Sequence, residues 1–154
     1  HKNMTILMAW ASGLEQFDEL GADLCDGVYF GAQYWHTADT PLNKDLVKLT
    51  ADKLKIVPNY SLAGSYVCTK ILIDGIVKAG TVDQKAVIAA LEGMKYEGLT
   101  GTEEIRKADH QVIKDYYLLK GKAKSKMKDA ADYVDVVSSG KSFLPIDKSG
   151  CKLA

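Results

Sequence analysis

"SYVCTKILIDGIVKAGTVDQKAVIAALEG", residues 65–93, is the most regular stretch of the sequence, and it decides the fold prediction. Its apolar residues recur at helical spacing and form a wide stripe in each half. Gly80 follows the first half, as is typical of a helix that ends in a left-handed cap. The stretch therefore predicts two helices, 65–80 and 82–93, joined by a tight connection.

The flanking sequence alternates between strand-like and helix-like runs. A buried strand is predicted at residues 4–10, further strands at 26–35, 111–120 and 132–140, and further helices at 14–25 and 40–54. We expect a Gly/Thr loop at 98–102 and a solvated hairpin at the basic run "KGKAKSKMK", 120–128. Strands that alternate with helices, followed by a late hairpin, are typical of an α/β domain with a mainly parallel sheet flanked by helices.

The composition is that of an ordinary globular domain. Of 154 residues, 47% are apolar and 26% charged, which allows one domain with a real core. Lys+Arg and Asp+Glu both number 20, so the basic excess of a nucleic-acid-binding protein is absent. No run approaches the roughly 18 apolar residues that a membrane span needs. The opening "HKNMTILMAW" has no signal peptide and enters a strand at once, which predicts a fragment whose targeting segment lies upstream.

Sequence motifs for chemistry are missing. The three cysteines form no C-x-x-C, and His36 and His110 lack partners at ligand spacing, so we expect no metal and no other cofactor. Neither G-x-S-x-G nor G-x-G-x-x-G occurs. Asp109 and His110 are neighbours, and in a strand their side chains would point to opposite faces. We therefore expect them to cap or bridge the backbone rather than to form a catalytic dyad, and a small α/β enzyme is the least supported function.

Trp10 and the pair Tyr34 and Trp35 are the candidate binding residues. They lie at the C-terminal ends of two predicted strands, which is the edge where open α/β sheets bind ligands. Aromatic residues at such positions more often belong to the core than to a site. Both interpretations stay open on spacing alone.

The order of several motifs resembles a known family. "YSLAGSYVCTKILIDGIVKAGTVDQKAVIAALEG", then "GLTG", then "IRKADHQVIKDYYLLKGK" resembles the C-terminal part of type I periplasmic solute-binding proteins. The branched-chain amino-acid group, which serves ATP-driven importers, is the most similar. The motifs on which the resemblance rests are Tyr66 before a long apolar helix, "KAGTVD", "ALEG" and R-x-x-DHQ before a strand. In the family R-x-x-DHQ leads into a strand, so the resemblance also gives Asp109 and His110 structural roles.

The resemblance implies two α/β lobes that close around a hinge onto a small-molecule solute. Residues of about 1–33 and 112–154 would belong to the C-terminal lobe, and about 36–110 would supply N-terminal-lobe elements and hinge crossings. The core of the first lobe is missing from these residues. A complete cleft would then need the missing N-terminal segment or a second copy of the chain.

The resemblance also assigns the solute side of the cleft. Trp10, Ala11, Ser12 and Tyr34 are expected to line it, whereas Trp35 is a weaker candidate that would alternatively pack into the hinge. Amino-acid-binding relatives carry an acidic residue after the matching strand, where it pairs with the ligand ammonium. Ala11 and Ser12 are not acidic. An apolar or aromatic carboxylate, or an amide, is therefore as plausible a solute as an amino acid.

The function implied is that of a non-catalytic, extracytoplasmic solute-binding component of an ABC importer. Its partners would be a small-molecule solute and the membrane permease, with no nucleic acid, and its location would be periplasmic or otherwise exported. A ligand-sensing module of a regulator or receptor with the same fold is the alternative.

The cysteines carry two further expectations. Cys68 lies on the apolar stripe of helix 65–80 and is expected to be a buried free thiol. An exported protein matures in an oxidising compartment, and by the resemblance Cys25 and Cys151 both belong to the C-terminal lobe. They are therefore the expected disulfide pair, with two unpaired thiols as the alternative.

Overall fold

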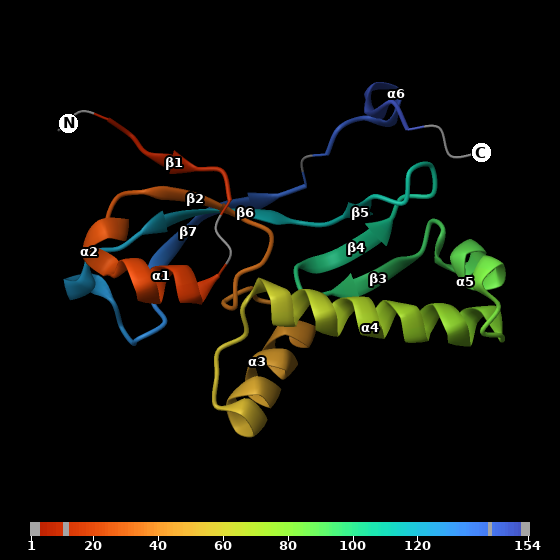
Figure 1. The fold of residues 1–154 in the computed structure, drawn as a ribbon, viewed down its shortest axis with the longest axis horizontal. Helices are drawn as coiled ribbons and strands as arrows, with labels where there is room; N and C mark the ends of the chain where they lie inside the picture. Colours follow the sequence, from red (N-terminus) through yellow and green to blue (C-terminus); the bar gives the residue numbers. More distant parts are fainter. Residues whose placement is uncertain (1–3, 11–12, 142, 152–154) are drawn as a thin grey trace.

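The strands form two separate sheets in the computed structural model, which describes residues 4–10, 13–141 and 143–151 (Figure 1). The four-stranded sheet has the order β1-β2-β6-β7 and the three-stranded sheet the order β3-β4-β5. The strands are β1 (Leu7–Met8), β2 (Tyr29–Ala32), β3 (Lys95–Gly98), β4 (Gly101–Ile105), β5 (Val112–Ile113), β6 (Tyr116–Gly121) and β7 (Val134–Gly140).

The α/β fold class is confirmed, but the pairing of the described strands is mixed rather than mainly parallel. β1 and β2 run parallel, whereas β2 and β6, β6 and β7, and both pairs of the three-stranded sheet are antiparallel. Short connections explain the antiparallel pairing of β3 with β4 and of β6 with β7, because a few residues can join only antiparallel neighbours and a parallel pair needs a long crossover. The segments that join β3 to β4 and β6 to β7 contain no crossover helix of that length.

The four-stranded sheet and the helices α1 (Leu14–Leu20) and α2 (Ala22–Cys25) enclose the larger core, and we call this part the four-stranded unit. Phe17 of α1 meets the rings of Phe30 and Trp35 edge-on, with centroids 4.8 and 5.5 Å apart. The single helix predicted for 14–25 is broken, because Gly21 has a φ of 77° that an α-helix does not accept. The buried residues of this core are Leu14, Phe17, Cys25, Phe30, Ala32, Trp35, Ala38, Tyr117, Leu119 and Val134.

The remaining long helices accompany the three-stranded sheet, and together they are called the three-stranded unit. These helices are α3 (Pro41–Leu54), α4 (Tyr60–Ala79) and α5 (Gln84–Leu91). Asn59 caps α4 through a hydrogen bond that its Oδ1 accepts from the Leu62 amide, so the helix begins earlier than the predicted residue 65. Gly80 ends α4 in the left-handed conformation, as predicted. Thr40 and Asp83 cap α3 and α5 in the same way as Asn59.

The β3–β4 hairpin replaces the loop that was predicted at 98–102. The carboxylate of Glu103 is buried and accepts hydrogen bonds from the Thr100 amide, the Thr100 hydroxyl and the Tyr96 hydroxyl, at 3.1, 2.8 and 2.9 Å. An inward-facing position of this strand is therefore occupied by a polar side chain. The usual apolar alternation of a strand is missing from the sequence for that reason.

The strand predicted for 111–120 is divided between the two sheets. β5 pairs with β4, whereas β6 pairs with β2 and β7. Residues 114–115 therefore cross from one unit to the other. The basic run after β6 contains a 3₁₀ turn, Lys124–Lys126, with exposed lysines and leads into β7, which confirms the solvated hairpin.

Two burial predictions are wrong for the described residues. The first strand was expected to be buried, but Leu7 of β1 is 64% exposed because β1 is an edge strand. Cys68 was expected to be sequestered, but it is exposed. Within α4 the buried residues are Ala63 and Gly75, and the apolar stripe around Cys68 consists of exposed and half-buried residues.

Candidate functional site

Trp10 lies where the loop after β1 meets the start of α4. Its ring packs edge-on against Tyr60, the first residue of α4, with centroids 6.1 Å apart and an interplanar angle of 80°. The ring remains 49% exposed, so it is open to a ligand. The predicted site residues Ala11 and Ser12 lie outside the described residues. Trp10 and Tyr60 thus join the four-stranded unit to the three-stranded unit.

Tyr34 and Trp35, which follow β2, face different surroundings. Trp35 is 4% exposed and packs against Phe17, so its ring belongs to the core and is not open to a solute. Tyr34 is also buried, and its hydroxyl donates a 2.7 Å hydrogen bond to Oδ1 of Asn43. Asn43 in turn donates to the carbonyls of His36 and Ala38, both at 2.8 Å. Burial raises the pKa of Tyr34, so the phenol stays protonated and holds this connection between the units.

A cavity of about 280 Å³ lies between α4 and the three-stranded sheet. Its aromatic walls are Tyr34, Tyr60, Tyr96 and Tyr116, and its polar groups include Lys114 and Glu103. Tyr34 is the predicted site residue that borders it directly, and Trp10 reaches its edge through Tyr60. The cavity therefore adjoins both segments, near 33–34 and 114–116, at which the chain passes between the two units.

A wider groove of about 790 Å³ lies on the other side of the start of α4. Its walls come from α1, from the connection between α3 and α4, and from Ala130 and Ala131. Nδ2 of Asn59 donates to both carboxylate oxygens of Glu15 across this groove, at 3.2 and 3.3 Å. An acidic side chain is thus present three residues after Ser12 in the sequence, on the following helix. Sequence reasoning missed Glu15, Asn59 and Tyr60, although Asn59 carries a recognisable helix-capping signal.

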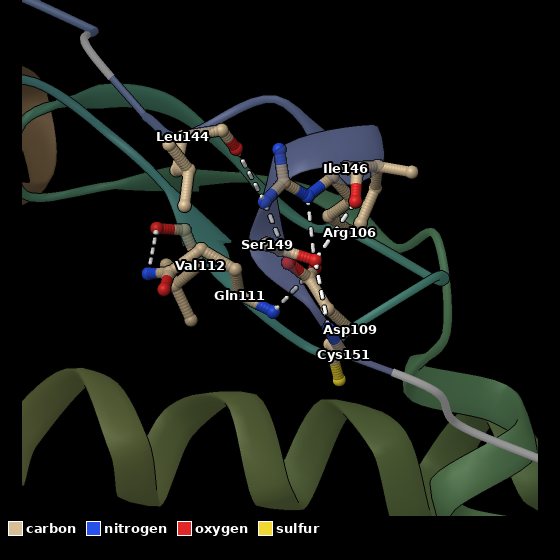
Figure 2. Close-up of polar contacts among 8 residues, drawn as sticks. All are labelled: Arg106, Asp109, Gln111, Val112, Leu144, Ile146, Ser149 and Cys151. Carbon is tan, nitrogen blue, oxygen red and sulfur yellow. Dashed lines mark hydrogen bonds and ion pairs between the residues drawn. The ribbon is translucent and has the colours of Figure 1, made fainter.

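Arg106 and Asp109 form an ion pair that orders the turn before β5 (Figure 2). Nε and Nη2 of Arg106 donate to the two oxygens of Asp109 at 2.8 and 2.6 Å, and the bond from Arg106 holds the pKa of Asp109 below its usual range. Asp109 also accepts from the Gln111 amide at 3.2 Å, which confirms its expected backbone-capping role. His110 has a φ of 56° and contacts Glu92 instead, with Nε2 and Oε1 3.2 Å apart. The two neighbours therefore form no dyad.

The same turn holds the C-terminal tail, in which α6 (Ile146–Ser149) is the only described helix. Nη2 of Arg106 donates to the Leu144 carbonyl at 3.2 Å (Figure 2). Nζ of Lys141 donates to the Thr102 carbonyl at 2.6 Å. Phe143 packs edge-on against Tyr116, with centroids 5.6 Å apart. The bonds of Arg106 and Lys141 place the tail against the three-stranded unit, and Phe143 contacts the first residue of β6.

The expected disulfide between Cys25 and Cys151 is not formed. Cys25 is buried in the core of the four-stranded unit, whereas Cys151 is exposed after α6. α2 lies at the left end of Figure 1 and α6 lies above the three-stranded unit in its right half. Hydrogen bonds of Arg106 and Lys141 hold the tail against the three-stranded unit, away from Cys25. Burial also raises the pKa of the Cys25 thiol, which disfavours its reactive thiolate form.

A metal site and a membrane-spanning helix are both absent from the described residues. No group of three or more His, Cys, Asp or Glu side chains there could hold a metal ion. Within the same part of the chain, no helix has the length and apolar character of a membrane span.

Comparison with known proteins identifies the family. A family model described as periplasmic binding protein matches residues 1–126. The chain belongs to the periplasmic binding protein family. A structure of an amino acid ABC transporter substrate-binding protein from Pseudomonas fluorescens is 51% identical, with a TM-score of 0.95; the match covers 99% of this chain and 41% of that one.

More distant members of the periplasmic binding protein family share the fold. A leucine-binding protein from Thermotoga maritima is 22% identical, with a TM-score of 0.71, over 89% of this chain and 37% of its own. A solute-binding protein of an ABC transporter from Rhodopseudomonas palustris, in complex with 3,4-dihydroxybenzoic acid, is 21% identical, with a TM-score of 0.73, over 84% of this chain and 34% of its own. A comparison with curated proteins returned no match. The chain therefore spans less than half the length of the relatives that it resembles.

Proposed function

We propose that this chain supplies one part of a two-lobed, non-catalytic solute-binding protein that serves an ABC importer. The observation that supports this proposal most directly is the junction between the two units at the start of α4. There the exposed Trp10 packs on Tyr60, and Asn59 holds Glu15 across a groove between the units. Aromatic surface beside a few fixed polar groups is the usual composition of a small-molecule site. The similarity to an amino acid ABC transporter substrate-binding protein supports the same function.

The lobes would correspond approximately to the two units described above. In this proposal the four-stranded unit belongs to the C-terminal lobe and the three-stranded unit to the N-terminal lobe. The chain crosses between them near residues 33–40 and 114–115. The rest of the cleft would come from residues outside 1–154 or from a second copy of the chain. The permease of the importer would be the membrane partner, and the protein would work in the periplasm or another exported location.

The groove favours a small solute with an apolar body. Trp10, Ala11 and Ser12 would contact that body, and Tyr34 would hold the connection between the two units through Asn43. Glu15 and Asp18 are the acidic residues that line this groove, and Asn59 holds the carboxylate of Glu15. The carboxylate of Glu15 would serve a solute that carries an ammonium group. An amino acid is then the first solute class to test, and a simple carboxylate or amide the second.

The test uses the protein that carries residues 1–154 together with the residues that complete both lobes. Calorimetry with L-leucine, 4-methylpentanoate and L-leucinamide separates recognition of the whole amino acid from that of either charged group. We expect one of the three to bind, and Trp10→Ala to weaken it by about tenfold, since loss of a partly buried aromatic contact costs on the order of 1.4 kcal/mol.

Leu24→Ala is the matched control, because Leu24 is an exposed apolar residue of α2 outside the groove. Its solute affinity should equal that of the unmodified protein. If Trp10→Ala also leaves every measured affinity unchanged, Trp10 is not a solute contact.

A further inference from the structure

The hairpin that joins β6 to β7 carries a group of lysines that no carboxylate of the described residues neutralises. Residues 120–128 contain five of the 20 Lys and Arg residues of the chain. Three of the five, Lys124, Lys126 and Lys128, are exposed, and we call them the lysine cluster. Among the described residues, their ammonium groups have no partner in an ion pair or a hydrogen bond. Exposed lysines elsewhere, such as Lys48, do pair with an aspartate.

The acidic residues of the same hairpin are engaged in other bonds. Lys122 donates to Asp132 at 2.6 Å and lies 3.1 Å from a carboxylate oxygen of Asp135. Asp132 also accepts the backbone amide of Lys128 at 3.0 Å, and Asp129 accepts a backbone amide two residues later at 2.8 Å. These bonds order the turn and occupy its carboxylates. The ammonium groups of the lysine cluster are therefore presented to solvent from an ordered turn.

The hairpin lies beside α1 and α2, on the side of the four-stranded unit away from the three-stranded sheet (Figure 1). Tyr133, just before β7, fixes one arm of the hairpin to α1. Its ring stacks on Phe17 with centroids 5.7 Å apart, and its hydroxyl donates to Asp18 at 2.9 Å. The Gly27 amide fixes the other arm by donating to the Gly121 carbonyl at 3.1 Å. The lysine cluster lines neither the groove beside Trp10 nor the cavity between α4 and the three-stranded sheet.

The chemistry of the cluster favours an extended anionic surface as its partner. A lysine ammonium is a compact point charge without the planar fork of arginine, so it selects charge rather than the shape of one bound anion. The only arginine of the chain, Arg106, is paired with Asp109 elsewhere. The formal net charge of the chain is zero, so an attraction at this hairpin would be a local property. Phospholipid surfaces with anionic headgroups attract such lysine clusters by about 1 kcal/mol per lysine.

We propose that the lysine cluster docks the protein on an anionic phospholipid surface. The docking is electrostatic and needs no insertion, because the turn from Ala123 to Lys128 exposes no large apolar side chain. It places the protein next to the membrane in which the permease works. That purpose rests on the proposed function, whereas the docking itself requires neither the solute nor the permease.

Flotation with lipid vesicles tests the docking on the protein that carries residues 1–154 and completes both lobes. Vesicles of phosphatidylglycerol mixed with phosphatidylcholine are compared with vesicles of phosphatidylcholine alone. We expect binding to the anionic vesicles alone, at low salt, and its loss at high salt, because salt screens exposed charges. The triple variant Lys124→Gln, Lys126→Gln and Lys128→Gln should bind the anionic vesicles more weakly by on the order of 100-fold. Absence of binding by the unmodified protein at low salt would overturn the proposal.

A second triple variant, Lys53→Gln, Lys85→Gln and Lys148→Gln, is the matched control. These lysines are exposed, have no ion pair among the described residues, and lie apart from one another on α3, α5 and α6. Both variants lose three positive charges, but only the first loses them at the hairpin. The control should lose less than about fivefold in affinity for the anionic vesicles. An equal loss in the two variants would show that net charge alone controls binding, and the proposal would fail. Circular dichroism and a thermal melt confirm that both variants are folded.

An acidic surface of the permease is the competing partner of the lysine cluster. Permease in nanodiscs of phosphatidylcholine alone distinguishes it from the lipid. If the unmodified protein binds these nanodiscs but not the anionic vesicles, and the hairpin variant binds neither, the cluster recognises a protein and the proposal is overturned. The hairpin variant should keep the solute affinity of the unmodified protein in calorimetry. Failure of the docking and failure of the proposed solute binding are therefore read from separate measurements.

Discussion

The two units of the molecule bury their apolar residues to very different extents. In the four-stranded unit, Phe17 lies at the centre of a continuous core and contacts the rings of Phe30, Trp35 and Tyr133. In the three-stranded unit, α4 is as apolar in sequence, yet Leu72, Ile73 and Val77 are exposed. Stability within this chain is therefore concentrated in the four-stranded unit. The second unit provides the cavity and surfaces that remain open for binding.

The largest expected effect is that of Phe17→Ala. It should lower the free energy of unfolding by about 3–5 kcal/mol, because a large cavity replaces the central ring of a closed core. Val77→Ala is the counterpart in the other unit and should change the same quantity by less than about 0.5 kcal/mol, since Val77 is 74% exposed. Urea unfolding followed by circular dichroism measures both. Equal losses in the two variants would contradict the contrast between the units.

Asn43→Leu should have the next largest effect, about 2–3 kcal/mol of destabilisation. The substitution leaves the buried Tyr34 hydroxyl and the carbonyls of His36 and Ala38 without their partner. Tyr34→Phe removes one of these bonds and should cost roughly 1 kcal/mol in the same urea experiment. A loss in Asn43→Leu no larger than in Tyr34→Phe would show that the two carbonyl bonds contribute nothing.

High pH should weaken the protein by a smaller amount. Burial raises the pKa of Tyr34, and raises that of Tyr117 to about 12 with help from Asp115 and Glu103. The folded protein therefore holds these protons more strongly than the unfolded chain, whose tyrosines titrate near pH 10. The stability is complete below about pH 10 and falls as the pH rises above it, by up to about 1 kcal/mol for each residue at pH 11.

Urea unfolding at pH 9 and pH 11 tests the alkaline effect. Tyr117→Phe should reduce the difference between the free energies of unfolding at these two pH values. Tyr29, for which burial is only partial, supplies the control as Tyr29→Phe. If the loss of stability between pH 9 and pH 11 is the same in Tyr117→Phe as in the unmodified protein, Tyr117 does not contribute to it.

Thiol labelling gives the smallest effect, since it changes no stability. In the native protein two thiols, those of Cys68 and Cys151, should react quickly with a maleimide, and Cys25 only after unfolding. Mass spectrometry of the digested protein identifies each labelled peptide. Protection of Cys68 would mean that α4 is covered in solution. A linked pair of peptides that contains Cys25 and Cys151 and separates on reduction would restore the disulfide.

The sequence determined the features whose signals are local. The helical period of residues 65–93 predicted α4 and α5, and Gly80 marked the end of α4 because its left-handed conformation is local to one residue. The alternation of strands and helices predicted the α/β class. The order of motifs such as R-x-x-DHQ predicted the family, and the backbone-capping role of Asp109 followed from its place before a strand.

Only the tertiary structure decided which of these elements meet. The β3–β4 hairpin is stabilised by three hydrogen bonds that Glu103 accepts within it. Residues 111–120 form two strands because β5 pairs in one sheet and β6 in the other. Trp35 is buried in the core, whereas Cys68 is exposed. Hydrogen bonds of Arg106 and Lys141 hold the tail that contains Cys151 away from Cys25. Each outcome depends on contacts between residues far apart in the chain. Such contacts are absent from any short window of sequence, so periodicity and composition could not predict them.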